Sequence, residues 1–208
     1  MKNIVILISG RGSNMEALLK ARLSCEVRCV ISNKPDAEGL KAAKTFGVDT
    51  RVLDHQDFSD RETYDNALAT LVESFKPDLV VLAGFMRILT PHFISRFEGK
   101  ILNIHPSLLP AFQGLNTHRR AIETGVKVHG CTVHVVTPDL DDGPIIVQAA
   151  TRVSQADTVD SLASKVLKLE HHIFPKAVEW MLTGSCRLEE GKITRDATLE
   201  SEGLLFVD

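Results

Sequence analysis

The chain has 208 residues, of which 44% are hydrophobic and 25% are charged, so it has enough length and apolar content for one globular core. Its 24 Lys and Arg residues against 27 Asp and Glu residues give a net charge of -3 without a dense basic run, which argues against a nucleic-acid partner. No apolar stretch has the length of a signal-peptide core or a membrane span, so we expect a cytoplasmic protein that does not associate with membranes.

The N-terminal half alternates between apolar runs and amphipathic segments. Residues 3–8 form a run rich in β-branched residues, a turn follows over residues 9–14, and apolar residues recur at helical spacing over 15–19. The alternation continues, with strands predicted at 27–31, 50–53, 77–83 and 100–105 and helices at 37–46 and 60–75. Ser59 and Glu62 have the spacing of a capping box at the start of the last of these helices.

The pattern changes in the C-terminal half. Residues 130–136 and 144–150 are predicted strands, and the acidic, glycine-containing bend between them is too short for a helical crossover, so we expect an antiparallel pair. An amphipathic helix is predicted over residues 158–181, kinked near its end by Pro175. Residues 187–194 are predicted to form a small hairpin.

Together these elements predict an α/β fold. Strands that are apolar on both faces need helices on both sides, so the expected architecture is an open, doubly wound, mostly parallel sheet with an antiparallel C-terminal extension. No linker rich in Pro, Gly or Ser divides the sequence, which favours a single domain over residues 1–208. The cysteines lack the paired CxxC spacing of zinc ribbons, and we expect reduced packing residues rather than metal ligands at Cys25, Cys29, Cys131 and Cys186.

The turn after the first strand has the composition of an anion-binding loop. Its sequence, SGRGSN at 9–14, opens the first predicted helix, where unpaired backbone amides and the positive end of the helix dipole can hold an anion. Met15 replaces the third glycine of the dinucleotide fingerprint and no Gly-Lys-Ser/Thr follows, so NAD and a nucleoside triphosphate are disfavoured. A single phosphomonoester fits better, although a tight turn that binds nothing is the alternative.

Two polar residues lie at the end of the strand predicted at 100–105. Asn103 and His105 are two positions apart, so their side chains project to one face near the carboxyl edge of the sheet, where ligands bind in open α/β folds. A lone histidine in an apolar run is as often a packing residue as a catalytic one. The neighbouring asparagine favours a functional site, because two polar side chains at a buried strand end need a polar partner.

Four motifs, in this order along the chain, resemble those of the folate-dependent formyltransferases. They are ISGRGSN at 8–14, LAGFMRIL at 82–89, NIHPSLLP at 103–110 and LDDGPII at 140–146. The resemblance is close to the members that formylate glycinamide ribonucleotide. It implies a Rossmann-related formyltransferase fold and transfer of the formyl group of 10-formyltetrahydrofolate, the co-substrate, to the amine of glycinamide ribonucleotide in purine biosynthesis, with no metal.

The resemblance implies that Asn103, His105 and Asp141 form the catalytic trio. Attack of an amine on the formyl carbon creates an oxyanion, which the Asn103 amide and a protonated His105 can stabilise. Asp141 would raise the pKa of His105, so that the imidazolium can act as proton donor to the leaving amine. Without the resemblance, the simplest interpretation of Asp141 is an acidic turn residue.

The resemblance also assigns residues to both substrates. It places the phosphate of glycinamide ribonucleotide on Gly12, Ser13 and Asn14, and Glu170 near the ribose or amine of that substrate. The residues implied to bind folate are Arg61, Met86, Arg87, Ile88, Leu89 and Asn103. Arg61 would meet the glutamate carboxylate of the folate; the alternative for this residue is a solvated surface charge or a helix-face salt bridge.

Residues 111–128 suit a mobile loop and short helix that close over the folate. Here the sequence departs from the family pattern Gly-x-His-x-His, because Asn116 stands in the place of the first histidine. Any pH-dependent ordering of the loop that depends on that histidine is therefore in doubt.

Three other functions compete with this interpretation. A formyltetrahydrofolate hydrolase would keep the catalytic trio, but it has no phosphorylated acceptor to explain residues 9–14. Methionyl-tRNA formyltransferase has a basic RNA-binding domain in addition, for which this chain is too short and too acidic. A non-catalytic module that binds folate or a phosphate ester would leave Asn103 and His105 unexplained. The sequence leaves open whether the protein is a monomer or a homodimer.

Overall fold

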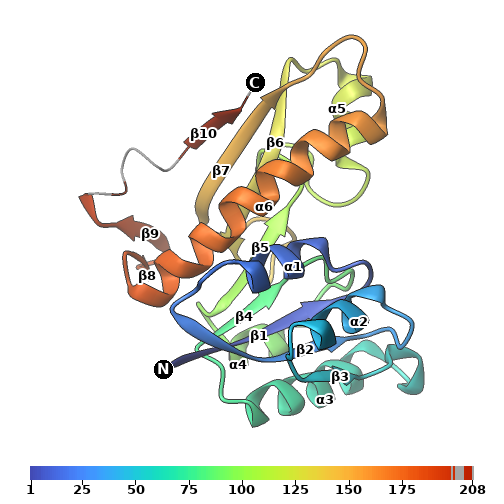
Figure 1. The fold of residues 1–208 in the computed structure, drawn as a ribbon, viewed down its shortest axis with the longest axis vertical. Helices are drawn as coiled ribbons and strands as arrows, with labels where there is room; N and C mark the ends of the chain where they lie inside the picture. The colour runs from blue at the N-terminus through green and yellow to red at the C-terminus, as the bar shows by residue number, and fades with distance from the viewer. Residues whose placement is uncertain (198, 200–203, 208) are drawn as a thin grey trace. The chain divides into compact units, whose positions relative to one another are not determined.

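The computed structural model describes residues 1–197, 199 and 204–207. The chain forms two compact units (Figure 1). The first consists of Met1–Asn103 and Val136–Pro138, and the second of Ile104–Val135 and Asp139–Asp208. The single-domain assignment of residues 1–208 stays a prediction.

The first unit contains a fully parallel sheet, as the sequence predicted. Its strands follow the order β5-β4-β1-β2-β3. Their bounds are β1 (Lys2–Ile8), β2 (Cys25–Ser32), β3 (Thr50–Val52), β4 (Leu79–Leu82) and β5 (Ile101–His105), of which β5 continues into the second unit. Residues 4–8 of β1 and all of β4 are buried, which explains why these runs are apolar without alternation.

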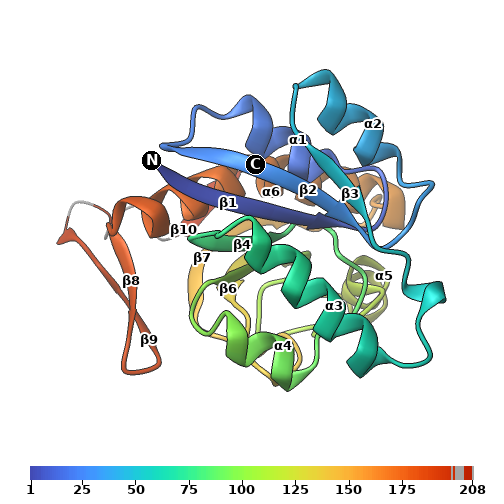
Figure 2. The ribbon, with the colours of Figure 1, turned by 90° about the horizontal axis from the view of Figure 1, so that it is seen from below.

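Helices cover both faces of this sheet. In Figure 2, α1 (Ser13–Lys20) and α2 (Glu38–Thr45) lie on one side of β1–β3, and α3 (Arg61–Ser74) and α4 (Pro91–Arg96) lie on the other. A short 3-10 helix, η1 (His55–Asp57), precedes α3. Of the helices in this unit, α4 and η1 were not predicted, because segments this short show little helical periodicity.

The predicted capping box at the start of α3 is wrong. The N-cap is Asp60, whose carboxylate accepts a hydrogen bond from the Thr63 backbone amide at 2.7 Å. Ser59 donates instead to the Asp60 carboxylate at 3.0 Å. Aspartate caps a helix as well as serine does, and the helix therefore begins one residue later than the Ser59–Glu62 spacing indicated.

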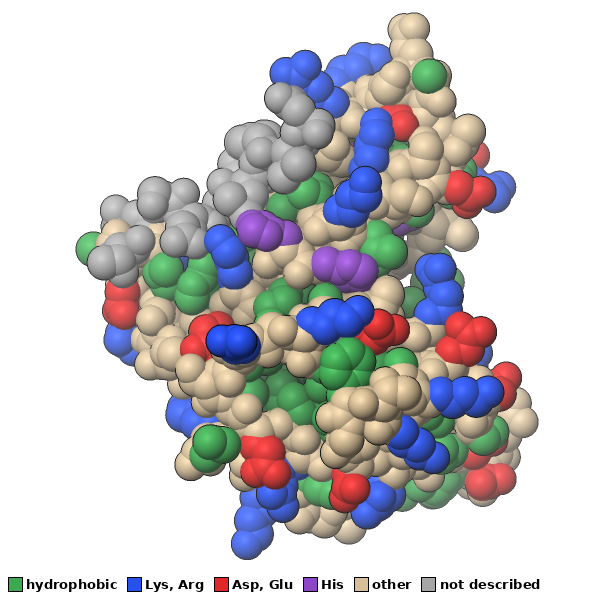
Figure 3. Space-filling view, in the orientation of Figure 1, with side chains coloured by type: hydrophobic (Ala, Val, Ile, Leu, Met, Phe, Trp, Pro, Cys, Tyr) green, Lys and Arg blue, Asp and Glu red, His purple; other side chains and the backbone are tan. Residues whose placement is uncertain are grey.

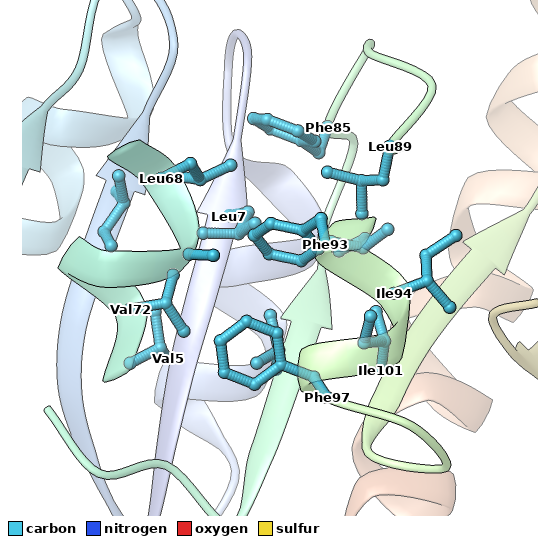
Figure 4. Close-up of a cluster of buried hydrophobic side chains, with 14 of the residues drawn as sticks. Val5, Leu7, Leu68, Val72, Phe85, Leu89, Phe93, Ile94, Phe97 and Ile101 are labelled. Atoms are coloured by element: carbon cyan, nitrogen blue, oxygen red, sulfur yellow. The ribbon is translucent and has the colours of Figure 1, made fainter. Parts of the chain in front are cut away.

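In the first unit, a hydrophobic cluster lies between the sheet and the helices α3 and α4 (Figure 4). Leu68 and Val72 of α3 pack with Phe93 of α4 against Val5 and Leu7 of β1. The segment between β4 and α4 adds two buried side chains to the same cluster, Phe85 and Leu89. The core therefore holds in place the chain that follows the carboxyl end of β4.

The second unit is built on an antiparallel strand pair, also as predicted. Strands β6 (Val128–Val135) and β7 (Ile145–Arg152) are antiparallel, with Val133 opposite Val147. The strand order is β10-β7-β6-β5, where β10 (Leu204–Val207) is parallel to β7 and was not predicted. The parallel sheet with its antiparallel extension confirms the predicted fold class.

One long helix packs on these strands. Helix α6 (Val159–Thr183) contacts β6 and β7 and continues past Pro175, whose predicted kink stays a prediction (Figure 1). Helix α5 (Thr117–Thr124) confirms the short helix expected within residues 111–128. Strands β8 (Cys186–Glu189) and β9 (Lys192–Arg195) form the predicted hairpin.

All four cysteines are free thiols, and Cys29, Cys131 and Cys186 are buried. Among the described residues, no cluster of three or more His, Cys, Asp or Glu side chains has an arrangement that could bind a metal ion. None of the described helices combines the length and apolar character needed to cross a bilayer.

Candidate active site

Strand β5 carries the two polar residues singled out from the sequence. His105 is its last residue and is buried, whereas Asn103 is partly buried. Their spacing of two residues places both side chains on the same face of the strand. Pro106, which lacks a backbone N–H, ends the strand directly after His105.

The ring of His105 lies between two oxygen acceptors of the second unit. Its Nδ1 is 3.4 Å from an Asp141 carboxylate oxygen, and its Nε2 is 3.1 Å from the backbone carbonyl oxygen of Phe112. Each ring nitrogen of His105 therefore faces an oxygen atom. The structure thus brings together two of the three residues assigned to catalysis, and both side chains are nearly buried.

Asp141 is held by the loop that follows β5. The Gly114 amide donates to its carboxylate at 2.9 Å, and the Gln113 side chain donates to its backbone carbonyl at 3.2 Å. Asp141 itself has a left-handed backbone, with φ of 51°. The bend between β6 and β7 therefore presents this carboxylate to both His105 and the loop.

A second histidine, not identified from the sequence, lies near the same carboxylate. His134 is in β6, and its Nε2 is 3.9 Å from Asp141 Oδ1. Burial lowers the pKa of His134, and His105 lowers it further, while its hydrogen bond to Val135 and the charge of Asp141 act in the opposite direction. A titratable residue near the end of an apolar strand, just before the acidic bend, is the sequence signal that could have found it.

Two more histidines form a pair beside the loop. His118 Nδ1 is 3.2 Å from His129 Nε2, and the Phe112 ring meets the His129 ring edge to face. Burial lowers the pKa of both, and their histidine neighbours lower it further, to about 4 for His129. Sequence analysis missed His129, because its partner is distant in sequence order and belongs to a different element.

Asn116 has a defined conformation in this loop. It directly precedes α5 with φ of 57°, in the left-handed region, and its side chain makes no capping hydrogen bond. Asparagine is among the non-glycine residues that tolerate this region best. At the position where the family pattern has histidine, this chain therefore has an asparagine with a left-handed backbone directly before α5.

The loop after β1 begins α1 as predicted. Gly12 is the N-cap residue with φ of 78°, and Ser13 and Asn14 form the first turn, so their amides lie at the positive end of the helix. A Cβ atom on Gly12 would be 2.8 Å from Gly39 Cα of α2, whose backbone amide donates to Gly10 O at 3.0 Å. Glycine is required at position 12 both by conformation and by this close approach.

The residues assigned to folate that lie after β4 differ in exposure. Met86 and Ile88 are 70% and 54% exposed, whereas Leu89 is buried in the hydrophobic cluster. The Arg87 guanidinium lies over the Tyr64 ring, 4.6 Å from its centroid. Its side chain therefore packs on Tyr64 of α3.

Two further assigned residues lie on helices. Arg61 is exposed and is the first residue of α3 in the first unit. Glu170 is buried on α6 in the second unit. Burial raises the pKa of the Cys131 thiol, and the Glu170 carboxylate adds to this shift.

Figure 3 shows how charged side chains are distributed on one face. Lys and Arg side chains are interspersed with Asp and Glu in the lower part of the view, and several Lys and Arg side chains lie near one another in the upper part.

The chain belongs to the formyl transferase family, whose model matches residues 2–178. It is 46% identical to the phosphoribosylglycinamide formyltransferase of Escherichia coli over 90% of this chain and 91% of that protein. It is also 47% identical to part of the human trifunctional purine biosynthetic protein adenosine-3, over 91% of this chain and 19% of that protein. The solved phosphoribosylglycinamide formyltransferase of Anaplasma phagocytophilum is 42% identical and has a TM-score of 0.92, covering 100% of this chain and 99% of that one.

Proposed function

We propose that this protein transfers the formyl group of 10-formyltetrahydrofolate to the amino group of glycinamide ribonucleotide. The products are formylglycinamide ribonucleotide and tetrahydrofolate, in purine biosynthesis. The geometric observation that supports this most is the buried His105–Asp141 pair at the carboxyl end of β5. The family membership and the names of the relatives agree with this reaction.

The chemistry requires an oxyanion stabiliser and a proton donor. When the substrate amine attacks the formyl carbon, negative charge develops on the formyl oxygen, and the Asn103 amide and the His105 imidazolium would stabilise it. As the intermediate collapses, the bond from carbon to folate N10 breaks. His105 would then protonate N10 and become neutral, and the proton that the attacking amine loses would return to His105. Asp141 would favour the charged form of His105 before each transfer and would orient its ring.

Glycinamide ribonucleotide carries a phosphate and a cationic amine. The phosphate would bind at the amides of Gly12, Ser13 and Asn14, where the α1 dipole favours an anion. Glu170 would bind the ribose or amine; its carboxylate is buried, and a buried carboxylate favours a cationic partner.

The folate is the co-substrate, as formyl-folate is for the formyltransferase family. Its pterin would lie along Met86, Arg87, Ile88 and Leu89, read by backbone groups, with Asn103 near the formyl group. Arg61, exposed at the start of α3, would bind the glutamate carboxylate. No metal enters the proposed reaction.

One assay separates this function from its alternatives. The protein is incubated with 10-formyltetrahydrofolate, with or without glycinamide ribonucleotide, and loss of the formyl group is followed. We expect loss only when the ribonucleotide is present. Loss without it would identify a formyltetrahydrofolate hydrolase, and no loss in either mixture would identify a binding module.

We also propose a cytoplasmic protein whose partners are small molecules rather than nucleic acid or membrane. Its state is a monomer or a homodimer, which sedimentation velocity would distinguish.

A further inference from the structure

The segment of residues 83–90, between β4 and α4, has no regular secondary structure, but it contains both buried and exposed apolar side chains. Phe85 and Leu89 point into the hydrophobic cluster beside Leu68 and Phe93 (Figure 4). The intervening Met86 is exposed. The buried side chains of Phe85 and Leu89 hold the segment at two points, and hydrogen bonds to its backbone amides fix its conformation further.

The acceptor of the first of these hydrogen bonds is Ser9, at the carboxyl end of β1. The Met86 backbone amide donates to Ser9 Oγ at 2.8 Å. The Ser9 hydroxyl in turn donates to Asn33 Oδ1 at 2.5 Å, so its hydrogen points away from Met86 and its lone pair toward it. Both Ser9 and Asn33 are buried, so solvent does not compete with this arrangement.

The acceptor of the second hydrogen bond is Asp65, on α3. The Thr90 backbone amide donates to Asp65 Oδ2 at 2.5 Å. Asp65 is fully buried, and its other oxygen has no hydrogen-bond partner within the described parts of the chain. A buried carboxylate with so few partners costs folding free energy, so its presence is not explained by stability.

Between these two anchored amides lie Arg87, Ile88 and Leu89. Within the part of the chain that the structure describes, their backbone amides donate no hydrogen bond. Three consecutive free amides held between two fixed ones form a rigid template for hydrogen bonding to a planar heterocycle.

We infer that Ser9 and Asp65 are positioning residues for folate, which fix the two ends of segment 86–90 so that its middle amides face the ligand. The inference rests on the proposed function. It assigns to Ser9, directly after β1, and to Asp65, within α3, an effect on folate binding that is separate from the binding of glycinamide ribonucleotide. Asp65 gives the cleaner test, because Ser9 is the first residue of the 9–14 loop proposed to bind phosphate.

The test replaces Asp65 by Leu, which has the same branching of side-chain heavy atoms but no acceptor, and by Asn, which matches Asp in size and keeps an acceptor oxygen. Asn66→Leu is the matched control, since Asn66 is the next residue of α3 and is exposed. Dissociation constants for tetrahydrofolate and glycinamide ribonucleotide are measured by calorimetry on each protein. Thermal unfolding of each variant verifies that it is folded.

We expect Asp65→Leu to weaken tetrahydrofolate binding by roughly tenfold or more, the effect of losing one hydrogen bond to a charged group. Glycinamide ribonucleotide binding should not change, the KM for folate should rise more than kcat falls, and Asp65→Asn and Asn66→Leu should bind folate like wild type. If Asp65→Leu proves too unstable, Ser9→Ala, rescued by Ser9→Thr, gives the same comparison for folate.

Equal tetrahydrofolate affinity in wild type and Asp65→Leu would overturn the positioning role and leave the proposed function intact. Equal weakening of the binding of both ligands would also overturn it, since that indicates a general structural role. A wild-type protein that binds no tetrahydrofolate would overturn the proposed function itself, and the inference with it.

Discussion

The Asp141 carboxylate is shared between a catalytic candidate and a loop. It lies 3.4 Å from His105 Nδ1 and accepts the Gly114 amide at 2.9 Å. Asp141 thus contacts both His105 and the loop of residues 112–116.

Removing the charge of Asp141 while keeping its shape tests the role proposed for this residue. We expect Asp141→Asn to bind tetrahydrofolate normally while kcat falls by roughly two to three orders of magnitude, since the imidazolium loses its counter-charge. Steady-state kinetics measures the effect, and Asp142→Asn, an exposed neighbour, is the control. Near-normal turnover in Asp141→Asn would show that the proposed role is wrong.

Individual site residues differ in how far sequence could find them. Asn103, His105 and Asp141 lie in motifs with a recognisable order along the chain. The Phe112 carbonyl that meets His105 belongs to a residue with φ of 54°, and no side-chain pattern encodes where a backbone carbonyl points. His134 was missed for a related reason, because its significance depends on the bend that brings Asp141 to it.

At the scale of elements, strand and helix type followed from periodicity, whereas boundaries depended on individual hydrogen bonds. The long apolar runs of β1 and β4 and the amphipathic α6 were predictable, because burial on both faces or one face sets their patterns. The start of α3 was not, because Asp60 and Ser59 are both good caps. Strand β10 was not predicted from the sequence.

The turn from β1 to α1 offers a prediction at this scale. Gly12→Ala should destabilise the fold by about 1–3 kcal/mol, because alanine is strained at φ of 78° and its Cβ would be only 2.8 Å from Gly39 Cα. The KM for glycinamide ribonucleotide should rise with it. Urea unfolding and kinetics measure both effects.

Gly10→Ala is the matched control in the same turn. A Cβ there would have no atom within 4 Å among the described residues, and the Gly10 backbone is not left-handed. Equal stability of the two variants would mean that the close approach of Gly12 to Gly39 does not constrain the turn.

At the scale of the whole molecule, buried histidines link folding to pH. Burial lowers the pKa of His118, His129 and His134 below its ordinary value. The folded protein therefore binds fewer protons at these positions than the unfolded chain. Stability is fully present above the unfolded histidine pKa of about 6.5 and is lost as the pH falls below it.

His129 should contribute a measurable part of this acid sensitivity, because its pKa falls to about 4 in the folded state. Between pH 7.5 and pH 4.5, wild type should lose free energy of unfolding on the order of 1–3 kcal/mol more than His129→Gln, which does not titrate. Urea denaturation at both pH values measures this difference. His92→Gln, at an exposed position of α4, should behave like wild type. The same pH-dependent loss in wild type and His129→Gln would mean that His129 is not held neutral by burial.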